Sequence, residues 1–227
     1  MKRILVVGGS HGIGKEIVNQ LVSENQIINF SRTRPDLDHN NLRHFEIDIL
    51  NSELPDIEEL DSIIYCPGSI NLKPIGSLKE EDFLNDFNIN VMGIVKTVKK
   101  YLKALKTSNN ASMVFFGTVA VGQGMPFHAS ISVAKAGVQA LGRSLAAELA
   151  PNVRVNCIAP SITDTPLAGS ILRNEKSRDR IAERHPLNRI INPKEIAALA
   201  SFLISDNAKS ISGQTYGVDA GMSTIKL

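Results

Sequence analysis

The sequence predicts an α/β fold in which a mostly parallel, seven-stranded sheet is covered by helices on both faces. Short apolar segments alternate along the chain with segments whose apolar residues recur at helical spacing. The apolar segments are nearly continuous, which is typical of strands buried on both faces. No internal repeat, low-complexity tract or linker interrupts the alternation. Residues 1–227 are therefore expected to form one doubly wound domain.

Each element is predicted from its own segment. The apolar segments predict strands over residues 3–7, 27–30, 45–47, 62–65, 112–116, 153–158 and 214–218. Helical spacing of apolar residues predicts helices directly after the first strand and over residues 90–106, 130–150 and 193–204. Pro193 suits the first turn of the last helix, where its missing N–H would have no partner. The segment 31–44 is short and polar, so we expect no full helix there.

The composition excludes several functional classes. Hydrophobic residues are 43% of the chain, charged residues 21%, and the net charge is +2, so no global field attracts nucleic acid or a membrane surface. The N-terminal apolar run stops at Gly8, too early for a signal peptide, and no segment is long enough to span a membrane. Cys66 and Cys157 lie in apolar surroundings, which favours a reducing compartment. We expect a cytoplasmic protein with no metal site.

The turn after the first strand predicts a dinucleotide site. Residues 8–14 read Gly-Gly-Ser-His-Gly-Ile-Gly, and a helix is expected to begin near Gly12. Glycines allow a sharp turn and let a pyrophosphate approach backbone N–H groups, while the helix N-terminus adds partial positive charge. Gly14 lets the helix pack closely on the strand. In this strand–turn–helix context we prefer a dinucleotide site to an ordinary tight turn. The expected contacts are Gly8, Ser10, His11, Gly12, Ile13 and Gly14.

The end of the second strand favours NADP over NAD. An NAD site carries an acidic residue about 20 residues after the turn, bonded to the ribose 2′-hydroxyl. Here Phe30 is followed by Ser-Arg-Thr-Arg, and the first acid is Asp36. Arg32 can pair with a 2′-phosphate through its planar guanidinium, and His11 can assist. If Arg32 is only a solvated loop residue, NAD is the alternative.

These and later motifs resemble the short-chain dehydrogenase/reductase family over the whole chain. Gly8-x-x-x-Gly12-x-Gly14 is similar to its cofactor turn, and Asp48-Ile49 to its adenine contact. The resemblance implies a Rossmann fold, hydride transfer between nicotinamide and a carbonyl carbon, and a homodimer or homotetramer formed through the helices 90–106 and 130–150. The 3-oxoacyl-acyl carrier protein reductases are the most similar branch. Further cofactor positions implied by the family are Gly68, Lys135, Pro160 and Thr165.

The resemblance also implies the catalytic positions, and one of them departs from the family. The family uses a tyrosine to donate the proton, a lysine four residues later, a serine thirteen residues earlier that polarises the carbonyl, and an asparagine that anchors a relay water. The matching residues here are Asn90, Thr118, Ile131 and Lys135. Ile131 stands in the place of the tyrosine and cannot donate a proton. Likewise only the glycine is kept where Gly68 ends the family's Asn-Asn-Ala-Gly motif.

Three interpretations of Ile131 stay open. In the first, His128 donates the proton: it lies seven residues before Lys135, the Tyr-x6-Lys spacing of the enoyl-carrier protein reductase branch, and imidazole titrates near neutral pH. Tyr65 is a second candidate. In the second, water protonates the product, which slows the reaction because a positioned acid is worth about 10²–10⁴-fold. In the third, the chain is a pseudoenzyme that binds NADP for a structural or regulatory purpose.

By resemblance, residues 161–192 lie over the substrate. Residues 173–194 carry an excess of basic side chains, which predicts either attraction of an acidic substrate or carrier protein, or a solvated amphipathic helix. An apolar wall is expected from Met125, Phe127, Ile131 and Leu167. The basic side chains are Arg173, Lys176, Arg178, Arg180, Arg184, Arg189 and Lys194.

Overall fold

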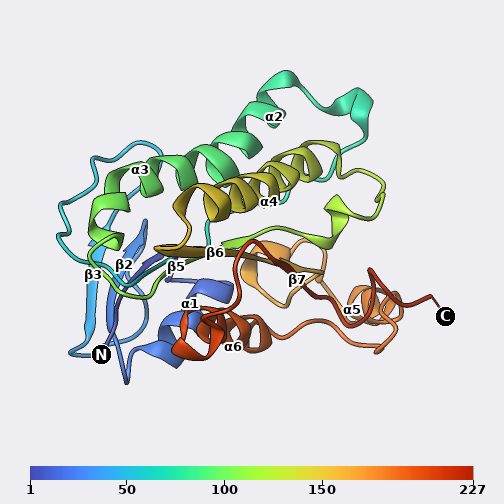
Figure 1. Ribbon diagram of the computed structural model, residues 1–227. Helices are drawn as coiled ribbons and strands as arrows, with labels where there is room; N and C mark the ends of the chain where they lie inside the picture. The colour runs from blue at the N-terminus through green and yellow to red at the C-terminus, as the bar shows by residue number, and fades with distance from the viewer. Residues whose placement is uncertain (227) are drawn as a thin grey trace.

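Seven parallel strands form one sheet in the order β3-β2-β1-β4-β5-β6-β7 in the computed structural model, which describes residues 1–226 (Figure 1). The order reverses between β1 and β4, where ligands bind in open α/β sheets. The predicted doubly wound parallel sheet is confirmed. The strands are β1 (Arg3–Val7), β2 (Gln26–Ser31), β3 (Leu42–Glu46), β4 (Ser62–Tyr65), β5 (Ala111–Phe116), β6 (Val153–Pro160) and β7 (Thr215–Val218).

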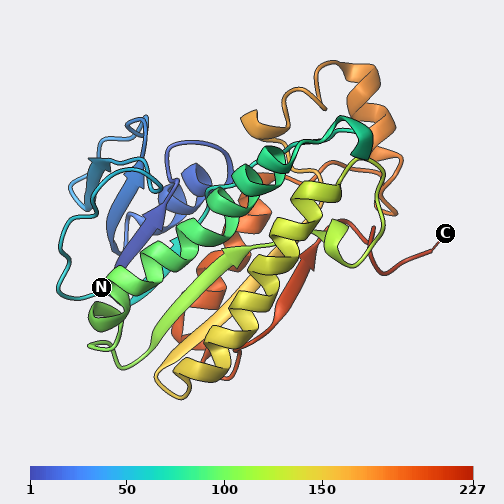
Figure 2. The ribbon, with the colours of Figure 1, turned by 90° about the horizontal axis from the view of Figure 1, so that it is seen from above.

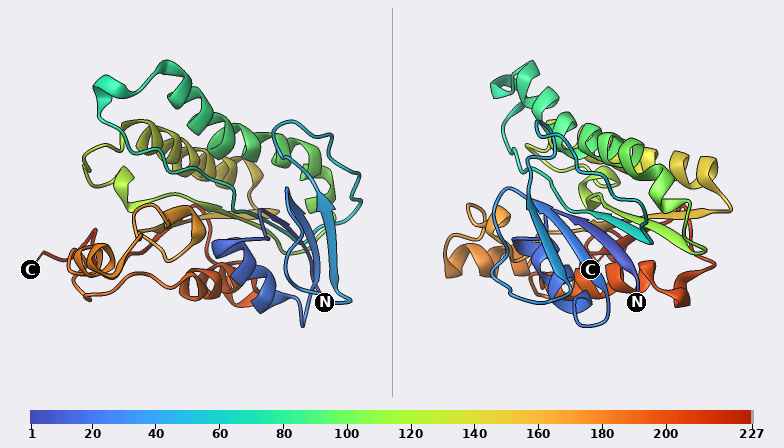
Figure 3. Two further views of the ribbon diagram at one scale, coloured as in Figure 1. Left: turned by 180° about the vertical axis from the view of Figure 1, so that it is seen from behind. Right: turned by 90° about the vertical axis from the view of Figure 1, so that its left-hand side faces the viewer.

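Helices cover both faces of the sheet. Figures 1 and 3 show α1 and α6 on one face and α2, α3 and α4 on the other. From above, the α2–α3 pair and α4 lie side by side over the sheet and run roughly along the direction of the strands (Figure 2). Each face buries its own apolar cluster against the sheet. The helices are α1 (Gly12–Leu21), α2 (Glu80–Phe87), α3 (Gly93–Leu105), α4 (Ala129–Leu149), α5 (Glu175–Ala182) and α6 (Pro193–Ile204).

Three elements differ from the sequence prediction. The third strand spans Leu42–Glu46 rather than 45–47, because an edge strand is half exposed and its apolar residues are not continuous. Helix α2 was not predicted, since only Asp86 of its eight residues is buried. It continues through a π-helical turn, Asn88–Met92, into α3. The basic segment forms α5, a mostly exposed helix that buries Ser177 and Ile181, which agrees with the solvated amphipathic helix expected as one alternative. Residues 31–44 hold no full helix, as predicted.

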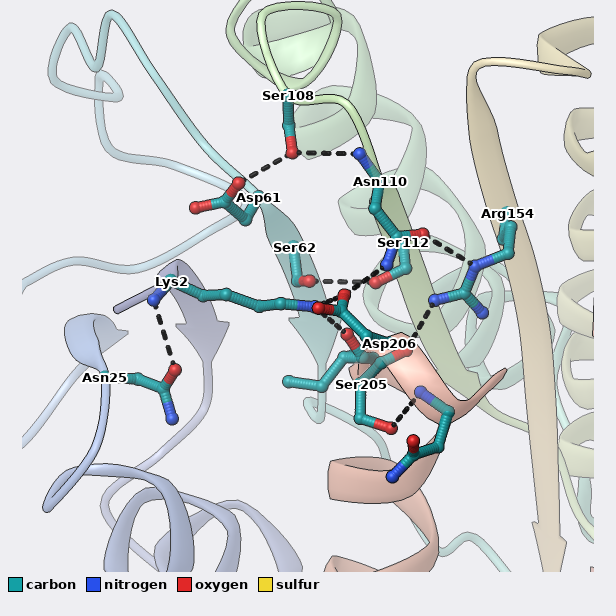
Figure 4. Close-up of polar contacts among 12 residues, drawn as sticks. Lys2, Asn25, Asp61, Ser62, Ser108, Asn110, Ser112, Arg154, Ser205 and Asp206 are labelled. Atoms are coloured by element: carbon teal, nitrogen blue, oxygen red, sulfur yellow. Dashed lines mark hydrogen bonds and ion pairs between the residues drawn. The ribbon is translucent and has the colours of Figure 1, made fainter. Parts of the chain in front are cut away.

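A network of hydrogen-bonded polar side chains links the amino ends of the central strands, at the edge of the sheet opposite the carboxyl ends where the site lies (Figure 4). Arg154 of β6 donates a 2.8 Å hydrogen bond to the Leu203 carbonyl and so caps the last turn of α6. The carboxylate of Asp206 accepts hydrogen bonds from Lys2 (3.0 Å) and Asn110 (2.6 Å). These bonds join α6 to β1 and β5, which fixes the helix that packs beside α1. Among residues 1–226, no helix is long and apolar enough to cross a bilayer.

Candidate active site and cofactor cleft

The turn between β1 and α1 has the geometry of an anion cradle. Gly8 and Gly12 have φ values of +83° and +54°, which L side chains rarely adopt. A Cβ on Gly14 would lie 2.1 Å from the Gly8 carbonyl oxygen, so only glycine fits there. His11 precedes α1 without capping it by a side-chain hydrogen bond, and the first turn holds no acid. The first N–H groups of α1 are therefore available to a phosphate, and the turn fits a dinucleotide pyrophosphate.

Asn29 supports this turn from inside the sheet. Its side chain is fully buried in β2, and its Oδ1 accepts a 2.9 Å hydrogen bond from the Gly9 backbone N–H. Its Nδ2 donates to Ser31 Oγ at 2.8 Å. The hydroxyl of Thr33 donates to Ser10 Oγ at 3.1 Å. The turn is thus tied to the end of β2. Sequence reasoning missed Asn29, although an amide inside an apolar strand was a usable signal.

The end of β2 places basic side chains beside the turn. Arg32 is exposed and has no ion pair or hydrogen bond among residues 1–226. Its positive charge makes a small contribution to the low pKa of Asp48, which is due first to the hydrogen bond from Asn51 and then to that from the Leu50 N–H. Asp48 therefore uses both carboxylate oxygens locally. Arg34 and Lys15 border a depression next to Gly12. Sequence reasoning missed both of these cations.

Lys135, Asn90 and Gly68 meet at the carboxyl ends of β4 and β5. Lys135 lies on α4 and donates a 2.8 Å hydrogen bond to the Phe116 carbonyl, and burial lowers its pKa to about 8. Asn90 lies in the π-helical turn and donates to the Asp86 carbonyl and to Ser69 Oγ, while its own Oδ1 is buried with no hydrogen-bond partner among residues 1–226. A Cβ on Gly68 would lie 3.2 Å from both Asn90 Oδ1 and Lys135 Nζ. Two polar atoms therefore face the same small space, which only glycine leaves open.

Three of the positions predicted at the catalytic site line one cavity. Thr118 donates from its hydroxyl to the Pro160 carbonyl at 3.4 Å. Ile131 is 5% exposed and forms part of the apolar wall. His128 is half buried, and its Nδ1 lies 2.7 Å from the Pro126 carbonyl oxygen. A carbonyl only accepts, so Nδ1 carries the hydrogen and Nε2 is the nitrogen able to exchange a proton.

Tyr65 does not belong to this group, and the idea that it donates the proton is wrong. Its hydroxyl donates a 2.7 Å hydrogen bond to the Ile89 carbonyl, and its side chain is 1% exposed. A Cβ on Gly93 would lie 1.8 Å from that hydroxyl, so the tyrosine fills the space under α3. Burial raises its pKa above the usual value. Tyr65 is part of the core on the other face of β4.

The cavity joins the cofactor turn to the segment after β6. Ile13 and Gly68 line it with Pro160 and Thr165, and a Cβ on Gly12 would lie 3.2 Å from the Thr165 side chain. Met125 and Leu167 join Ile131 in the apolar wall, whereas Phe127 is exposed outside it. Sequence reasoning missed several further wall residues, because their meeting depends on the loops above the sheet. These are Cys66, Ser69, Ile70, Ser161 and Met222, whereas Arg184 was already predicted among the basic side chains over the substrate.

Comparison with known proteins agrees with this geometry. A family model described as "Enoyl-(Acyl carrier protein) reductase" matches residues 49–223. The chain belongs to the short-chain dehydrogenase/reductase family. Within that family it resembles the 3-oxoacyl-[acyl-carrier-protein] reductase MabA of Mycobacterium tuberculosis, with 28% identity over 231 residues that cover 97% of this chain and 92% of MabA.

Two further members of the family extend the comparison. The 3-oxoacyl-[acyl-carrier-protein] reductase FabG of Thermotoga maritima is 33% identical over 146 residues, which cover 64% of this chain and 58% of that protein. A short-chain dehydrogenase family protein from Francisella tularensis superposes with a TM-score of 0.89 at 26% identity, covering 99% of this chain and 100% of the other. The seven-stranded fold is therefore that of a short-chain dehydrogenase/reductase.

Proposed function

We propose that this chain is an NADP(H)-dependent oxidoreductase that reduces a carbonyl or oxidises the matching alcohol, with a proton donor other than tyrosine. One observation carries the proposal: a single cavity joins the glycine turn, through Ile13, to Lys135 and Thr118. When bound, NADPH would supply a hydride to the carbonyl carbon. The protein has to bind that cofactor, orient the carbonyl and provide a proton.

The basic side chains beside the turn support NADP rather than NAD. No acid follows β2 at the place where a ribose 2′-hydroxyl would be bound, and Arg32 is free to pair with a 2′-phosphate. Arg34 borders a depression on the same side of Gly12, but Lys15 pairs there with Asp36, and Glu16 and Asp164 also line the depression. The preference for NADP therefore rests on Arg32. NAD is the alternative dinucleotide.

Lys135, Asn90 and Thr118 would position the reactants. Lys135 presents a buried amine next to Gly68, where the family resemblance expects it to bind the nicotinamide ribose. The partnerless Oδ1 of Asn90 lies beside the same glycine and can accept a further hydrogen bond. Thr118 offers its hydroxyl at the cavity wall, where it can hold a carbonyl oxygen.

His128 is one candidate for the proton donor that the sequence offers, beside water. Its Nδ1–H is held by the Pro126 carbonyl, which leaves Nε2 to exchange a proton. The preceding residue, Phe127, has a φ of 67°, which is costly for a bulky side chain and turns the chain sharply before α4. Because His128 lines the cavity, reduction of an enoyl thioester is a further alternative reaction. Its role stays a prediction, which the His128→Ala variant tests.

A pseudoenzyme is the second candidate function, and Ile131 favours it. This side chain is buried in the wall and offers nothing to a developing alkoxide. The Lys135 amine is already bonded to the Phe116 carbonyl, so cofactor binding alone could account for its presence. Such a protein would bind NADP tightly and turn over carbonyl substrates slowly or not at all.

An anionic group on the substrate is favoured by Arg184. It lines the apolar cavity, and its guanidinium has no ion-pair partner among residues 1–226. By contrast, Arg178 pairs with Asp164 and Arg189 pairs with Glu195. A free acid with an apolar body would fit this cavity. MabA and FabG are named as reductases of 3-oxoacyl groups linked to a carrier protein, and in such a substrate the acyl group is a neutral thioester, so the negative charge would have to lie on the carrier.

The setting we propose is a cytoplasmic homodimer or homotetramer of one-domain subunits. The resemblance predicts contacts through the helices 90–106 and 130–150, and on this face Val133 of α4 and Leu84 of the adjoining α2 are largely exposed. Apolar side chains on such a face are typical of a helix-to-helix interface between copies.

The proposal is tested by binding followed by turnover. Titration should give tighter binding of NADPH than of NADH by about tenfold or more. Stereospecific oxidation of NADPH is then followed with acetoacetyl-CoA, phenanthrenequinone and a 2-enoyl-CoA as probes. Tighter NADH binding would contradict the role of Arg32. Tight NADPH binding without oxidation by any probe would favour the pseudoenzyme.

A further inference from the structure

Ser161 and His185 form a hydrogen-bonded pair in the wall of the same cavity, and neither has a role in the function described above. Ser161 directly follows β6, is half buried and lines the cavity. Its Oγ lies 2.7 Å from Nε2 of His185. His185 is 1% exposed and sits behind the serine, shielded from solvent. A buried imidazole therefore reaches the cavity through one hydroxyl group.

The hydrogen bonds of His185 determine which atom of the Ser161–His185 pair donates and which accepts. Its Nδ1 lies 2.8 Å from the Ile181 carbonyl oxygen, which only accepts, so Nδ1 carries the hydrogen. In the neutral imidazole, Nε2 then accepts the hydrogen of Ser161. In the imidazolium, Nε2–H donates to Ser161 Oγ and frees the serine hydrogen to point elsewhere. The other neighbour of that hydroxyl is Met222 Sδ at 3.3 Å, a weak acceptor.

The surroundings balance the charge that His185 would carry. Burial alone would raise the pKa of Asp219, but hydrogen bonds from Ser223 and Gly221 hold it below its usual value, and the nearby His185 contributes in the same direction. Asp219 is therefore an anion beside the imidazole. Arg184, the preceding residue, is the opposing positive charge, and its side chain is exposed.

Ser161 directly follows the residue whose carbonyl accepts the hydrogen bond of Thr118, and both Ser161 and Thr118 line the cavity. Thr118 Oγ1 donates to the carbonyl of Pro160, the residue before Ser161, so both hydroxyl-bearing residues flank one stretch of the cavity wall. His128 lines the cavity too, but on the loop before α4 and hydrogen-bonded only to the Pro126 carbonyl. Two cavity hydroxyls rest on a buried base: Ser69 donates to the carboxylate of Asp86, and Ser161 is paired with the imidazole of His185. A carboxylate only accepts, so Ser161 is the hydroxyl whose partner can return a proton.

We propose that Ser161 donates the proton to the carbonyl oxygen in place of the missing tyrosine, and that His185 positions and reprotonates it. The proposal rests on the proposed function. In reduction, the carbonyl carbon takes a hydride from the reduced nicotinamide dinucleotide, and the C=O π pair moves onto oxygen. That oxygen takes the Ser161 proton, Ser161 takes the Nε2 proton of the imidazolium, and His185 becomes neutral. Overall, the carbonyl group gains one hydride and one proton and becomes an alcohol.

Variants of the full-length protein, assayed with NADPH and the carbonyl probe on which the wild type is fastest, test the relay. Ser161→Ala should lower kcat by about 10²-fold or more while KM changes less than about threefold. Ser161→Thr keeps a hydroxyl and should recover most of kcat. His185→Gln should resemble Ser161→Ala, with its melting temperature showing that it folds. The control Ser210→Ala, at an exposed position before β7, should match the wild type.

A second measurement needs no cofactor. In nitrogen-15 NMR of the free protein, neutral His185 should be protonated on Nδ1, and Ser161→Ala should shift its Nε2 resonance. An Nε2–H tautomer would overturn the proposal, as would unchanged kcat in Ser161→Ala when the wild type turns over. A larger loss in His128→Ala than in Ser161→Ala would overturn it too. A wild type that binds NADPH without oxidising it would instead contradict the proposed function, and the relay with it.

Discussion

Lys135 Nζ donates a 2.8 Å hydrogen bond to the carbonyl oxygen of Phe116, the last residue of β5. In other short-chain dehydrogenases/reductases the matching lysine acts beside a tyrosine that lies one helical turn earlier. In this chain that position holds Ile131. The amine is buried, and desolvation lowers its pKa to about 8 from an ordinary value of 10.5. Lys135 is therefore a costly buried cation whose benefit has to come from binding a ligand.

This cost predicts a pH dependence of stability. Below about pH 8 the amine is charged in both folded and unfolded chains, and burying the charge costs its full amount. Between about 8 and 10.5 the unfolded chain binds more protons, so the free energy of unfolding rises with pH. Lys135→Met removes the effect. Its stability relative to wild type should fall by on the order of 1–3 kcal/mol across that window, measured by urea unfolding. If the free energies of unfolding of the wild type and of Lys135→Met changed equally with pH, the lowered pKa of Lys135 would be contradicted.

Ile131→Tyr tests whether the site lacks only a proton donor. Ile131 lines the cavity one turn before Lys135, so a tyrosine would bring a hydroxyl beside a positive charge. We expect kcat for carbonyl reduction to rise by about tenfold or more. Ile131→Phe is the matched control, because it adds the ring without the hydroxyl. Equal kcat values for Ile131→Tyr and Ile131→Phe would mean that the pocket differs from the family's catalytic site in more than the missing tyrosine.

Arg32→Ala tests the choice of dinucleotide. The guanidinium is free at the end of β2, and losing a charged hydrogen bond to a phosphate costs about 1.5–3 kcal/mol. NADPH should bind about tenfold or more weakly, with NADH affinity unchanged, as measured by fluorescence titration. Arg43→Ala is the control, since Arg43 stacks over Phe45 on β3. A parallel loss for both dinucleotides would remove Arg32 from the 2′-phosphate site.

Gly14→Ala should disrupt the phosphate turn. The new Cβ would lie 2.1 Å from the Gly8 carbonyl oxygen, a backbone atom that cannot move without opening the turn. We expect a loss of stability above about 3 kcal/mol and loss of dinucleotide binding. Gly76→Ala meets nothing within 4 Å and should change stability by less than about 0.5 kcal/mol. Thermal unfolding of both variants measures the contrast, and similar melting temperatures would refute it.

Arg184→Ala probes the charge of the substrate. If an anionic group pairs with this guanidinium, KM for an acidic carbonyl probe should rise by about tenfold while KM for a neutral ketone stays constant. Arg180→Ala, on the exposed side of α5 and outside the cavity wall, is the matched control. Equal effects of the two variants on KM would assign the preference to the general basic charge of the segment.

The sequence predicted the buried strands well and the half-exposed elements poorly. Strands such as β1 and β5 are almost entirely apolar because both faces of the sheet are covered, and that pattern is visible without a structure. The edge strand β3 and helix α2 bury few residues, so their apolar periodicity is weak. The π-helical turn that carries Asn90 left no periodic signal, since one turn is too short to repeat.

The sequence by itself determined the glycine turn, the absence of an acid after β2 and the isoleucine in the tyrosine's place, because each depends on residue type and local spacing. Only the tertiary structure decided that Tyr65 lies in the core, that Asn29 braces the turn and that Ser161 is backed by His185. These depend on contacts between residues far apart in the chain, such as the 24 positions between Ser161 and His185. Packing sets those contacts, and local spacing carries no record of them.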